Sequence, residues 1–487
     1  MKRVRDWLDV RLGASALYKG VLDRDMPDRL TWWHTLGSAT FTTFVLLVVT
    51  GIVIATYYSA SPVHAYDSVW YLQNEVLGGA LIRGMHHWSA SAMVVLLIAH
   101  MIRVFTWGAY KYPREANWWV GVLLFIVVMG FSFTGYLLPW DQKAYWATQV
   151  GIGIAGTTPV IGDVAATVLR GGPELGAGTL ARFYAFHTLW LPGALGLLVL
   201  VHMSLVVRHG IAPEARALEA GAPKSTSHPE YPAYYDQAYA ASKSGRKKFW
   251  PDIIAKDIVV SVVVVALIMA LALRFGAGLE PPANPSDASY VPTPEWYFLP
   301  LYQLLTLVPG SLESLVAVGV PTALILALLA LPLVDRRSKR SIWRRPLAAG
   351  ALVFVLAGSG YLIGTATRAR TFEAPEQVGP PIPASARTGA ALYRANGCSD
   401  CHSIAGEGGN EGPELTDIGM RHTVGWLHSF IEDPARFHED SDMPSFGLPQ
   451  LTHQEVEELS LYLETLRGDA LPSEQPEFFD TFPPIGR

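Results

Sequence analysis

The chain has 487 residues, and its composition differs from that of an ordinary soluble protein. Charged residues make up 16% of it, against about 25% in a typical soluble domain, and half of the residues are hydrophobic. The mean hydropathy is +0.25. These values exclude a disordered chain and disfavour an ordinary soluble enzyme. Two cysteines are too few for a disulfide scaffold.

The net charge of −5 is divided unevenly along the chain. Residues 371–487 hold 20 acidic side chains, six arginines and no lysine, a net charge of −14, so residues 1–370 carry +9. We therefore expect two regions of opposite character joined near residue 370. Neither shows a lysine-rich polar patch with interleaved aromatic residues, so no nucleic-acid partner is expected.

Seven stretches are apolar over the roughly 20 residues that a helix needs to cross a bilayer. They are residues 36–58, 84–107, 117–138, 184–207, 255–275, 312–334 and 347–366. Of the lysines and arginines before residue 371, 24 fall on the N-terminal side of the membrane and seven on the other side. This asymmetry predicts a multi-pass protein of a bacterial cytoplasmic membrane with a cytoplasmic N-terminus and an outer C-terminal region. The basic amphipathic segment 1–30 is not typical of a cleaved signal peptide.

Two of the predicted helices carry two histidines each. His86 and His100 are 14 residues apart in the second span. His187 and His202 are 15 apart in the fourth. Each pair therefore lies along one helix face, with ~21 Å between its members. Antiparallel helices would set His86 opposite His187 and His100 opposite His202, which predicts an outer and an inner bis-histidine haem b. Core histidines or a proton relay are the alternatives. His87 points about 100° away from His86 and is not an expected ligand.

Glycines and arginines accompany the histidines. Two glycine pairs repeat the 14-residue interval: Gly37 and Gly51 in the first span, and Gly121 and Gly135 in the third. Glycine lets a flat ring approach the backbone, although membrane helices also use it for packing. Arg83 and Arg103 each lie three residues from a predicted ligand. They are candidates to pair with haem propionates, or they are snorkelling interface residues.

Both cysteines fall in one motif, Cys398-Ser-Asp-Cys401-His402. The C-x-x-C-H pattern is typical of a covalently attached haem c with the histidine as an axial ligand. A redox dithiol or half of a zinc site is the alternative. Met443 is the predicted sixth ligand because methionine often completes such haems. Met420 is its rival within this region, and flexible core filling is the other role of a methionine.

Five segments resemble a known family. They are Arg83–Ala92, His100–Arg103, Gly135–Gln142, Arg182–His187 and Pro292–Leu299. Through them, residues 1–366 resemble cytochrome b of the quinol–cytochrome c reductases. The seven spans are most similar to the photosynthetic branch, in which this protein is two polypeptides. The resemblance implies two non-covalent haems b, quinol and quinone as substrates, and a homodimer.

The resemblance also locates a quinol site at Pro294-Glu295-Trp296-Tyr297. A carboxylate between aromatic and apolar residues is poorly solvated, which suits Glu295 to accept a proton from a quinol hydroxyl. Pro294 would fix the backbone, and Trp296 and Tyr297 would wall the pocket. Three further side chains could border the site: Tyr136, Asp141 and Tyr145.

In that family one electron goes to a Rieske iron–sulfur protein and the other crosses the membrane through the b haems, coupled to proton translocation. The photosynthetic branch also carries a haem bound through one cysteine at the start of the first span. Thr35 stands at that position, and no cysteine precedes Cys398, so no covalent haem is expected at the inner quinone site. The C-terminal region resembles class I cytochromes c and would pass electrons to a downstream cytochrome c or a terminal oxidase.

The expected fold is all-α: a seven-helix transmembrane bundle with a four-helix dihaem core, and a small helical cytochrome c domain. The expected domains are an amphipathic segment (1–30), the dihaem bundle (31–210), a cytoplasmic loop (211–254), three further spans with the quinol motif (255–366), a linker (367–385), the cytochrome c domain (386–470) and a proline-rich tail (471–487). Two other functions remain open, a dihaem membrane anchor without bifurcation and a proton-relay transporter.

Overall fold

The computed structural model describes residues 2–13, 15, 20, 22–172, 174–285, 293–372, 384–404, 407–409, 411–437, 441 and 443–466. Within them, seven helical stretches are long and apolar enough to cross a membrane, which confirms the predicted number. They are Trp32–Ala55, Gly79–Thr106, Glu115–Leu137, Ala177–His209, Phe249–Phe275, Leu315–Val334 and Pro346–Arg368. The third of them shows why such segments form helices, because its run of apolar residues can satisfy its backbone in lipid only internally.

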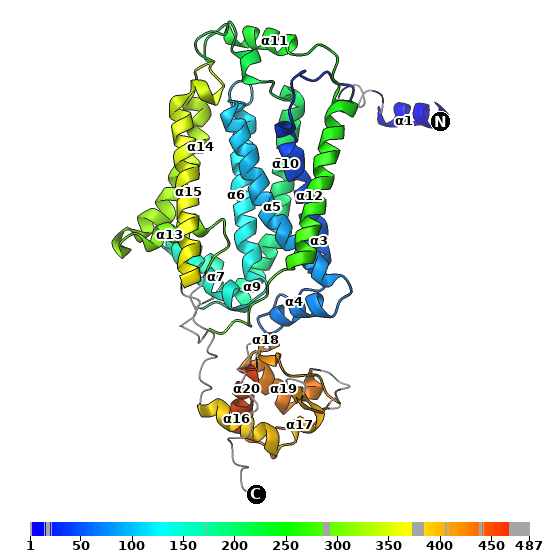
Figure 1. Ribbon diagram of the computed structural model, residues 1–487, viewed down its shortest axis with the longest axis vertical. Helices are drawn as coiled ribbons and strands as arrows, with labels where there is room; N and C mark the ends of the chain where they lie inside the picture. The colour runs from blue at the N-terminus through cyan, green and yellow to red at the C-terminus, as the bar shows by residue number, and fades with distance from the viewer. Residues whose placement is uncertain are drawn as a thin grey trace.

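The spanning stretches are built from regular helices and short turns of other pitch. These elements are η2 (Trp32–Thr35), α3 (Leu36–Ala55), α5 (Gly79–Thr106), α6 (Glu115–Leu137), α9 (Ala177–Ala185), η3 (Phe186–Trp190), α10 (Leu191–His209), η5 (Phe249–Ile253), α12 (Ile254–Phe275), η7 (Leu315–Gly319), α14 (Val320–Val334) and α15 (Pro346–Phe372). Helix α3 packs on α5, and α6 packs on α10, which gives the predicted four-helix core. Helix α12 covers α3 and α5, and α14 lies against α6 (Figure 1).

Shorter helices lie outside the spanning stretches. They are α1 (Lys2–Leu12), α4 (Ala65–Asn74), α7 (Gln142–Gly156), α8 (Gly162–Arg170), η4 (Ala215–Leu218), α11 (Tyr231–Ala241), α13 (Leu299–Thr306), η6 (Gly310–Leu312) and η8 (Ile342–Arg344). In Figure 1, α11 lies at one end and α4, α7 and α9 lie at the other. The search for long apolar runs could not find these elements, since none of them spans a bilayer.

The C-terminal domain is mostly helical and has its own core. Its elements are α16 (Ala384–Ala395), α17 (Cys398–Cys401), α18 (Ile418–Arg421), α19 (Val424–Glu432), η9 (Pro434–Arg436) and α20 (His453–Glu464), with the short antiparallel strands β1 (Ser403–Ile404) and β2 (Glu407–Gly408). Helices α16, α19 and α20 bury a cluster that includes Tyr393, Leu427 and Leu459. Among the described residues of this domain, the strand pair departs from the helical expectation.

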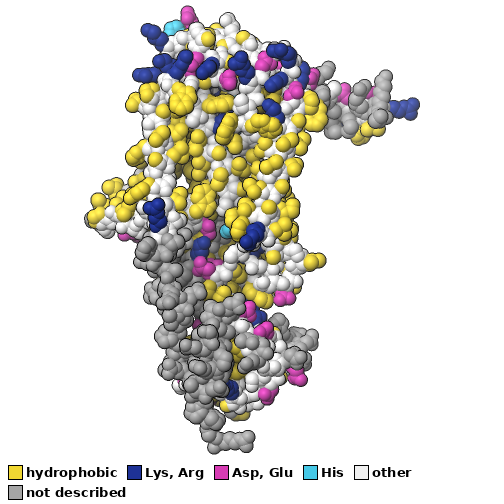
Figure 2. All heavy atoms as spheres, viewed as in Figure 1, with side chains coloured by type: hydrophobic (Ala, Val, Ile, Leu, Met, Phe, Trp, Pro, Cys, Tyr) yellow, Lys and Arg dark blue, Asp and Glu magenta, His cyan; other side chains and the backbone are white. Residues whose placement is uncertain are grey.

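The C-terminal domain contacts the bundle through α4. His422 Nδ1 lies 3.2 Å from Asp67 Oδ1, and the Arg421 guanidinium lies 5.2 Å from the centre of the Trp70 ring. The domain sits at the end of the bundle opposite α11 (Figure 1). In Figure 2, lysines and arginines gather at the α11 end, and hydrophobic side chains form a broad band below it.

The boundaries of the expected linker differ from the prediction. Helix α15 continues to Phe372, and α16 begins at Ala384, so both ends of the segment 367–385 are helical. A helix need not stop where its apolar run stops, because its backbone bonds persist in water. Residues 373–383 and the whole proline-rich tail 471–487 lie outside the described residues.

Candidate functional site

The outer histidine pair faces across two helices. His86 on α5 and His187 on η3 have ring centres 6.3 Å apart, with 68° between the ring planes. A metal ion lies ~2 Å from each imidazole nitrogen that binds it. The separation of the two rings therefore leaves room for one iron between them, as the predicted pairing requires.

Hydrogen bonds select which nitrogen of each outer histidine is free. Thr50 Oγ1 donates to Leu46 O at 2.7 Å and lies 2.9 Å from His86 Nδ1. Because the threonine proton is already used, Nδ1 donates and Nε2 keeps its lone pair. Thr134 does the same for His187, with Oγ1 donating to Gly130 O at 2.9 Å and lying 3.2 Å from Nδ1. Both rings thus leave Nε2 as the nitrogen that could bind a metal.

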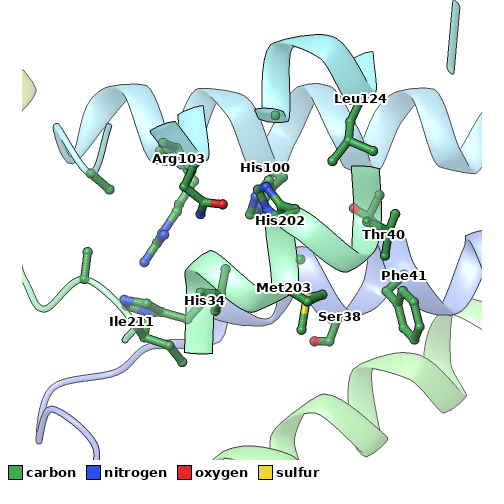
Figure 3. A pocket seen from close by; sticks show the side chains of 18 of the residues that line it. His34, Ser38, Thr40, Phe41, His100, Arg103, Leu124, His202, Met203 and Ile211 are labelled. Atoms are coloured by element: carbon green, nitrogen blue, oxygen red, sulfur yellow. The ribbon is translucent and has the colours of Figure 1, made fainter. Parts of the chain in front are cut away.

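The inner pair, His100 and His202, lines a cavity of about 370 Å³ between the helices. Figure 3 shows both histidines and Arg103 at this cavity. Arg103 Nε and Nη2 are buried without a hydrogen-bond partner among the described residues. A buried guanidinium with open donors fits an anionic group such as a haem propionate.

The four predicted glycines each face one of the four histidines. A Cβ built on Gly135 would lie 2.5 Å from His187 Cε1, and one on Gly51 would lie 3.1 Å from His86 Cε1. Gly37 faces His100 at 3.3 Å, and Gly121 faces His202 at 3.8 Å. The shared 14-residue interval therefore reflects room for the imidazole rings themselves.

The 15-residue interval between His187 and His202 has a structural cause. His187 lies in η3, a π-helical turn in which the Leu191 N–H bonds to Phe186 O, five residues earlier. A π turn absorbs one extra residue into a helix. Without that extra residue, the interval between His187 and His202 equals the 14 residues between His86 and His100, which lie in the regular helix α5. Regular helical periodicity in the sequence does not reveal this turn.

Arg83 occupies a different environment from Arg103. Its Nη1 donates to Ala277 O at 2.7 Å, and its Nη2 donates to Gly278 O at 2.6 Å. It also contacts the Gln73 side chain. In the structure Arg83 ties α5 to the segment that follows α12, and a propionate-binding role for it stays a prediction.

The quinol motif brings Glu295 against a lysine that the sequence analysis had counted only for orientation. Lys143 Nζ donates to Glu295 Oε1 at 2.8 Å, with both side chains partly buried. Lys143 also lies 5.5 Å from the centre of the Tyr136 ring. The sequence places only seven lysines and arginines before residue 371 on the outer side. A lysine in this sparsely basic region was the sequence feature that could have indicated a specific role for Lys143.

Contacts with the helix bundle fix the aromatic residues of the motif. Trp296 Nε1 donates to Ser91 Oγ on α5 at 3.4 Å, and Tyr297 packs edge-on against Trp296 with ring centres 5.4 Å apart. Burial, and then the nearby Glu295 carboxylate, raise the pKa of Tyr297, so its phenol stays neutral. Tyr136 OH donates to Thr293 O at 3.2 Å, just before Pro294.

The other two candidates at the outer end of α6 have structural roles. Asp141 caps α7 by accepting from Ala144 N at 2.8 Å, and it accepts from Glu280 N at 3.1 Å. Burial raises the pKa of Asp141 to about 6. Tyr145 packs edge-on against Trp140, with ring centres 5.8 Å apart. Asp141 therefore joins the start of α7 to the segment after α12.

His34 and Asp257 line the cavity of the inner pair, and the sequence analysis missed both. The His34 ring packs against Trp107 with centres 4.8 Å apart. Ser38 Oγ donates to Asp257 Oδ1 at 2.6 Å. Thr35 lies beside them, buried at the start of α3. Both are ionisable side chains at the end of a membrane span, and this feature of the sequence could have identified them as candidate site residues.

In the C-terminal domain the C-x-x-C-H motif forms a short helix and the turn after it. His402 Nδ1 lies 2.8 Å from Pro413 O, which leaves Nε2 for iron. A Cβ on Gly412 would lie 2.5 Å from His402 Cε1. Met443 packs on the same core cluster as Cys398. Met443 as the sixth ligand stays a prediction.

The thiols do not resemble those of a redox dithiol. Burial raises the pKa of Cys398 to about 11, and the pKa of Cys401 is raised by desolvation and by the Glu411 carboxylate. Redox-active C-x-x-C motifs instead lower the pKa of a thiol. The residues of both regions thus fit the implied groups: two haems b between the facing histidines and one haem c on Cys398, Cys401 and His402.

Facing histidine pairs in a four-helix membrane core, with a C-x-x-C-H domain beyond one end, define a membrane cytochrome. Residues 21–210 match the family description Cytochrome b/b6/petB, residues 282–375 match Cytochrome b(C-terminal)/b6/petD, and residues 386–467 match Cytochrome c. The chain belongs to the cytochrome b/b6 family and carries a C-terminal cytochrome c domain.

Curated relatives share almost half of the chain. The menaquinol:cytochrome c reductase cytochrome b subunit of Geobacillus thermodenitrificans is 45% identical over 220 residues, which are 44% of this chain and 98% of that protein. The subunit of the same name from Bacillus subtilis (strain 168) is 44% identical over the same shares. Cytochrome b6 of Synechococcus elongatus is 39% identical over 212 residues, 44% of this chain and 99% of that protein.

A solved structure is similar over a larger part of the chain. A chain of a hyperthermophilic respiratory Complex III is 27% identical, with a TM-score of 0.63. The similarity covers 74% of this chain and 91% of that one. The chain therefore has a Complex III-like fold.

Proposed function

We propose that this chain is the catalytic cytochrome b subunit, with a fused cytochrome c, of a quinol–cytochrome c oxidoreductase. The observation that carries the proposal is the pair of facing histidine couples in one bundle, each backed by glycines. A dihaem anchor would share them but has no reason for the Glu295–Lys143 pair beside two aromatic residues. A transporter would not need the C-x-x-C-H domain.

The chain's own residues would hold three haems. His86 and His187 would hold the outer haem b, and His100 and His202 the inner one. Cys398, Cys401, His402 and Met443 would hold haem c. Bound there, the haems would supply the one-electron carriers that bifurcated quinol oxidation requires. Arg103 would neutralise a propionate of the inner haem with its open donors.

Glu295 would accept the first proton of the quinol at the outer face. In the structure its carboxylate accepts a hydrogen bond from Lys143 Nζ. A quinol hydroxyl that approaches Glu295 would therefore have to bind beside the lysine or replace it as the hydrogen-bond partner. Tyr297, kept neutral, could donate a hydrogen bond to a quinol or quinone oxygen, but its protonated phenol could not act as the base for the quinol hydroxyl. Trp296, fixed by Ser91, would form an apolar wall.

The partners and the orientation follow from the same proposal. We infer a separate Rieske iron–sulfur protein, the quinone pool, and a downstream cytochrome c or terminal oxidase as partners, and a homodimeric complex. The basic end of the bundle would face the cytoplasm. Proton release outside and uptake at the inner cavity would then conserve energy. The names of the Geobacillus and Bacillus relatives make menaquinol the first quinol to test.

The number of haems is the direct test of this proposal. A pyridine haemochrome spectrum of the purified chain should show two b haems for each covalently bound c haem. The b haem should leave on acid–acetone extraction, and the c haem should stay with the polypeptide. Equal amounts of b and c, or no c signal, would exclude the architecture.

A substitution tests the proposed base. Glu295→Gln removes the proton acceptor and keeps the size of the side chain, and it should lower quinol oxidation by about 100-fold or more, as the loss of a general base does. Glu313→Gln, at an exposed position on the same connection between α12 and α14, is the control and should leave turnover within about twofold. Turnover of Glu295→Gln equal to that of the control would remove Glu295 from the mechanism.

A further inference from the structure

Three potential metal ligands converge on the surface of the C-terminal domain, outside the haem motif. His428 and Glu432 stand four residues apart on α19, and His453 is the first residue of α20. One ligand atom from each of the three lies within 4.8 Å of the others. None of them belongs to the residues that would hold haem c.

The local contacts already draw the three side chains together. His428 Nδ1 lies 3.7 Å from Glu432 Oε2, and His453 Nδ1 contacts Glu432 Oε1. The two imidazole rings lie nearly parallel, with 14° between their planes and centres 6.0 Å apart. One carboxylate therefore stands between two imidazoles.

The backbone beneath these ligands is fixed. Thr423 caps α19 by accepting from Trp426 N. Thr452 and Glu455 form a capping box at the start of α20, directly before His453. The two helices also pack on each other in the domain core. The ligands thus stand on two braced helices, and only side-chain rotation is needed to adjust them.

We propose that His428, Glu432 and His453 bind one divalent transition-metal ion of the zinc class. Two imidazoles and a carboxylate suit such ions, whereas calcium and magnesium prefer all-oxygen ligands. Bonds of about 2.0–2.2 Å to a tetrahedral ion place the ligand atoms roughly 3.5 Å apart. The three ligand atoms already lie within 4.8 Å of one another, so small side-chain movements bring them to that distance. The side chain of His453 is 73% exposed, and that of His428 is 25% exposed. Water can therefore complete the coordination.

The ion would connect the two ends of one loop. Glu432 ends α19 and His453 begins α20, and the segment 433–452 between them carries Met443. The hydrogen bond from Phe446 N to Ile431 O, 2.9 Å long, holds the same loop from within. A metal clip across a loop restricts its opening. Binding should therefore stabilise the domain. It should also restrict the loop that carries Met443, and the importance of that loop for haem c rests on the proposed function.

Metal binding can be measured on the whole purified chain, without any assay of turnover. The protein in detergent is stripped with a chelator and titrated with Zn²⁺ against a chromophoric zinc indicator. We expect wild type to bind one more equivalent than His453→Asn, and Glu432→Gln to weaken that site at least tenfold. His453 is largely exposed, so its replacement should not unfold the domain, and an unchanged content of haem c checks this.

A matched control uses another histidine–glutamate pair. His228 Nδ1 lies 4.0 Å from Glu230 Oε2 on the exposed cytoplasmic loop, and no third ligand groups with them among the described residues. His228→Asn should bind Zn²⁺ as wild type does. Equal stoichiometry and affinity in wild type, His453→Asn and Glu432→Gln would overturn the proposal.

A second readout separates the site from the haem proposal. Saturating Zn²⁺ should raise the thermal midpoint of the C-terminal domain in wild type and leave it unchanged in His453→Asn. Binding without this rise would refute the bracing role. A chain that lacks haem c but still shows the one-equivalent difference would refute the proposed function and not the metal site.

Discussion

Four glycines decide how closely α3 and α6 approach the histidine rings of α5, η3 and α10. The interval of 14 residues is visible in the sequence, and it predicts room for a flat cofactor. The structure shows that each glycine faces the edge of an imidazole. The pattern was therefore informative, but its physical reason needed coordinates, because only a built Cβ shows what it would meet.

The glycines differ in how much space they leave, which yields a test at the residue scale. Gly135→Ala places a methyl group 2.5 Å from His187 Cε1, closer than carbon atoms tolerate, whereas Gly121→Ala places one at an ordinary 3.8 Å from His202. We expect Gly135→Ala to lose the outer haem b and Gly121→Ala to keep both. The haem b to haem c ratio measures the difference, and equal ratios in the two variants would contradict it.

The ion pair between Lys143 and Glu295 is another residue-scale feature that sequence patterns could not show. The two residues are 152 positions apart, and no local pattern links them. The motif around Glu295 was recognisable because its four residues are contiguous. Its partner Lys143 is brought to the motif by α7, and only the tertiary structure shows this contact.

The π turn η3 is the main feature at the scale of elements. Helical periodicity alone turns 15 residues about 100° further than 14, so His202 would drift away from the line of His187. The π-helical hydrogen bond from Leu191 N to Phe186 O removes that drift. A periodicity argument treats every helix as regular, and so it could pair the histidines but not explain their unequal spacing.

Deleting one residue tests whether η3 absorbs the extra position. Removal of Leu189, an exposed residue of the turn, should convert it to a regular α-helix with 14 residues between the histidines, and both haems b should be retained. Removal of Val95, an exposed residue of α5, should rotate His86 by about 100° relative to His100 and lose one haem b. Haem b per chain, measured for both deletions, distinguishes the outcomes. Equal loss in both would mean that η3 has no such role.

The division of charge is the feature of the whole molecule. Lysines and arginines collect at the α11 end of the bundle, and the acidic domain docks at the other end through His422 and Asp67 (Figures 1 and 2). Basic segments are retained in the cytoplasm during membrane insertion. The proposed orientation thus rests on the charges of the bundle, independently of the haem c domain.

Epitope tags at the two ends of the chain test this orientation. A C-terminal tag should be digested by protease added to spheroplasts and protected in inverted membrane vesicles, while an N-terminal tag should behave in the opposite way. A cytoplasmic tag of known location, followed in the same preparations, checks that the membranes are sealed. Digestion of both tags from one side would contradict an odd number of spans.

Much of this protein was determined by local sequence. Seven apolar runs, two histidine couples and one C-x-x-C-H motif specify the spans and the candidate ligands, since length, periodicity and a contiguous motif are local properties. Tertiary structure decided the rest: the short helices at the ends of the bundle, the π turn, the Lys143–Glu295 pair, and the approach of His428, Glu432 and His453. These features depend on side chains that are distant in sequence or on a departure from ideal helix geometry, and packing alone brings them about.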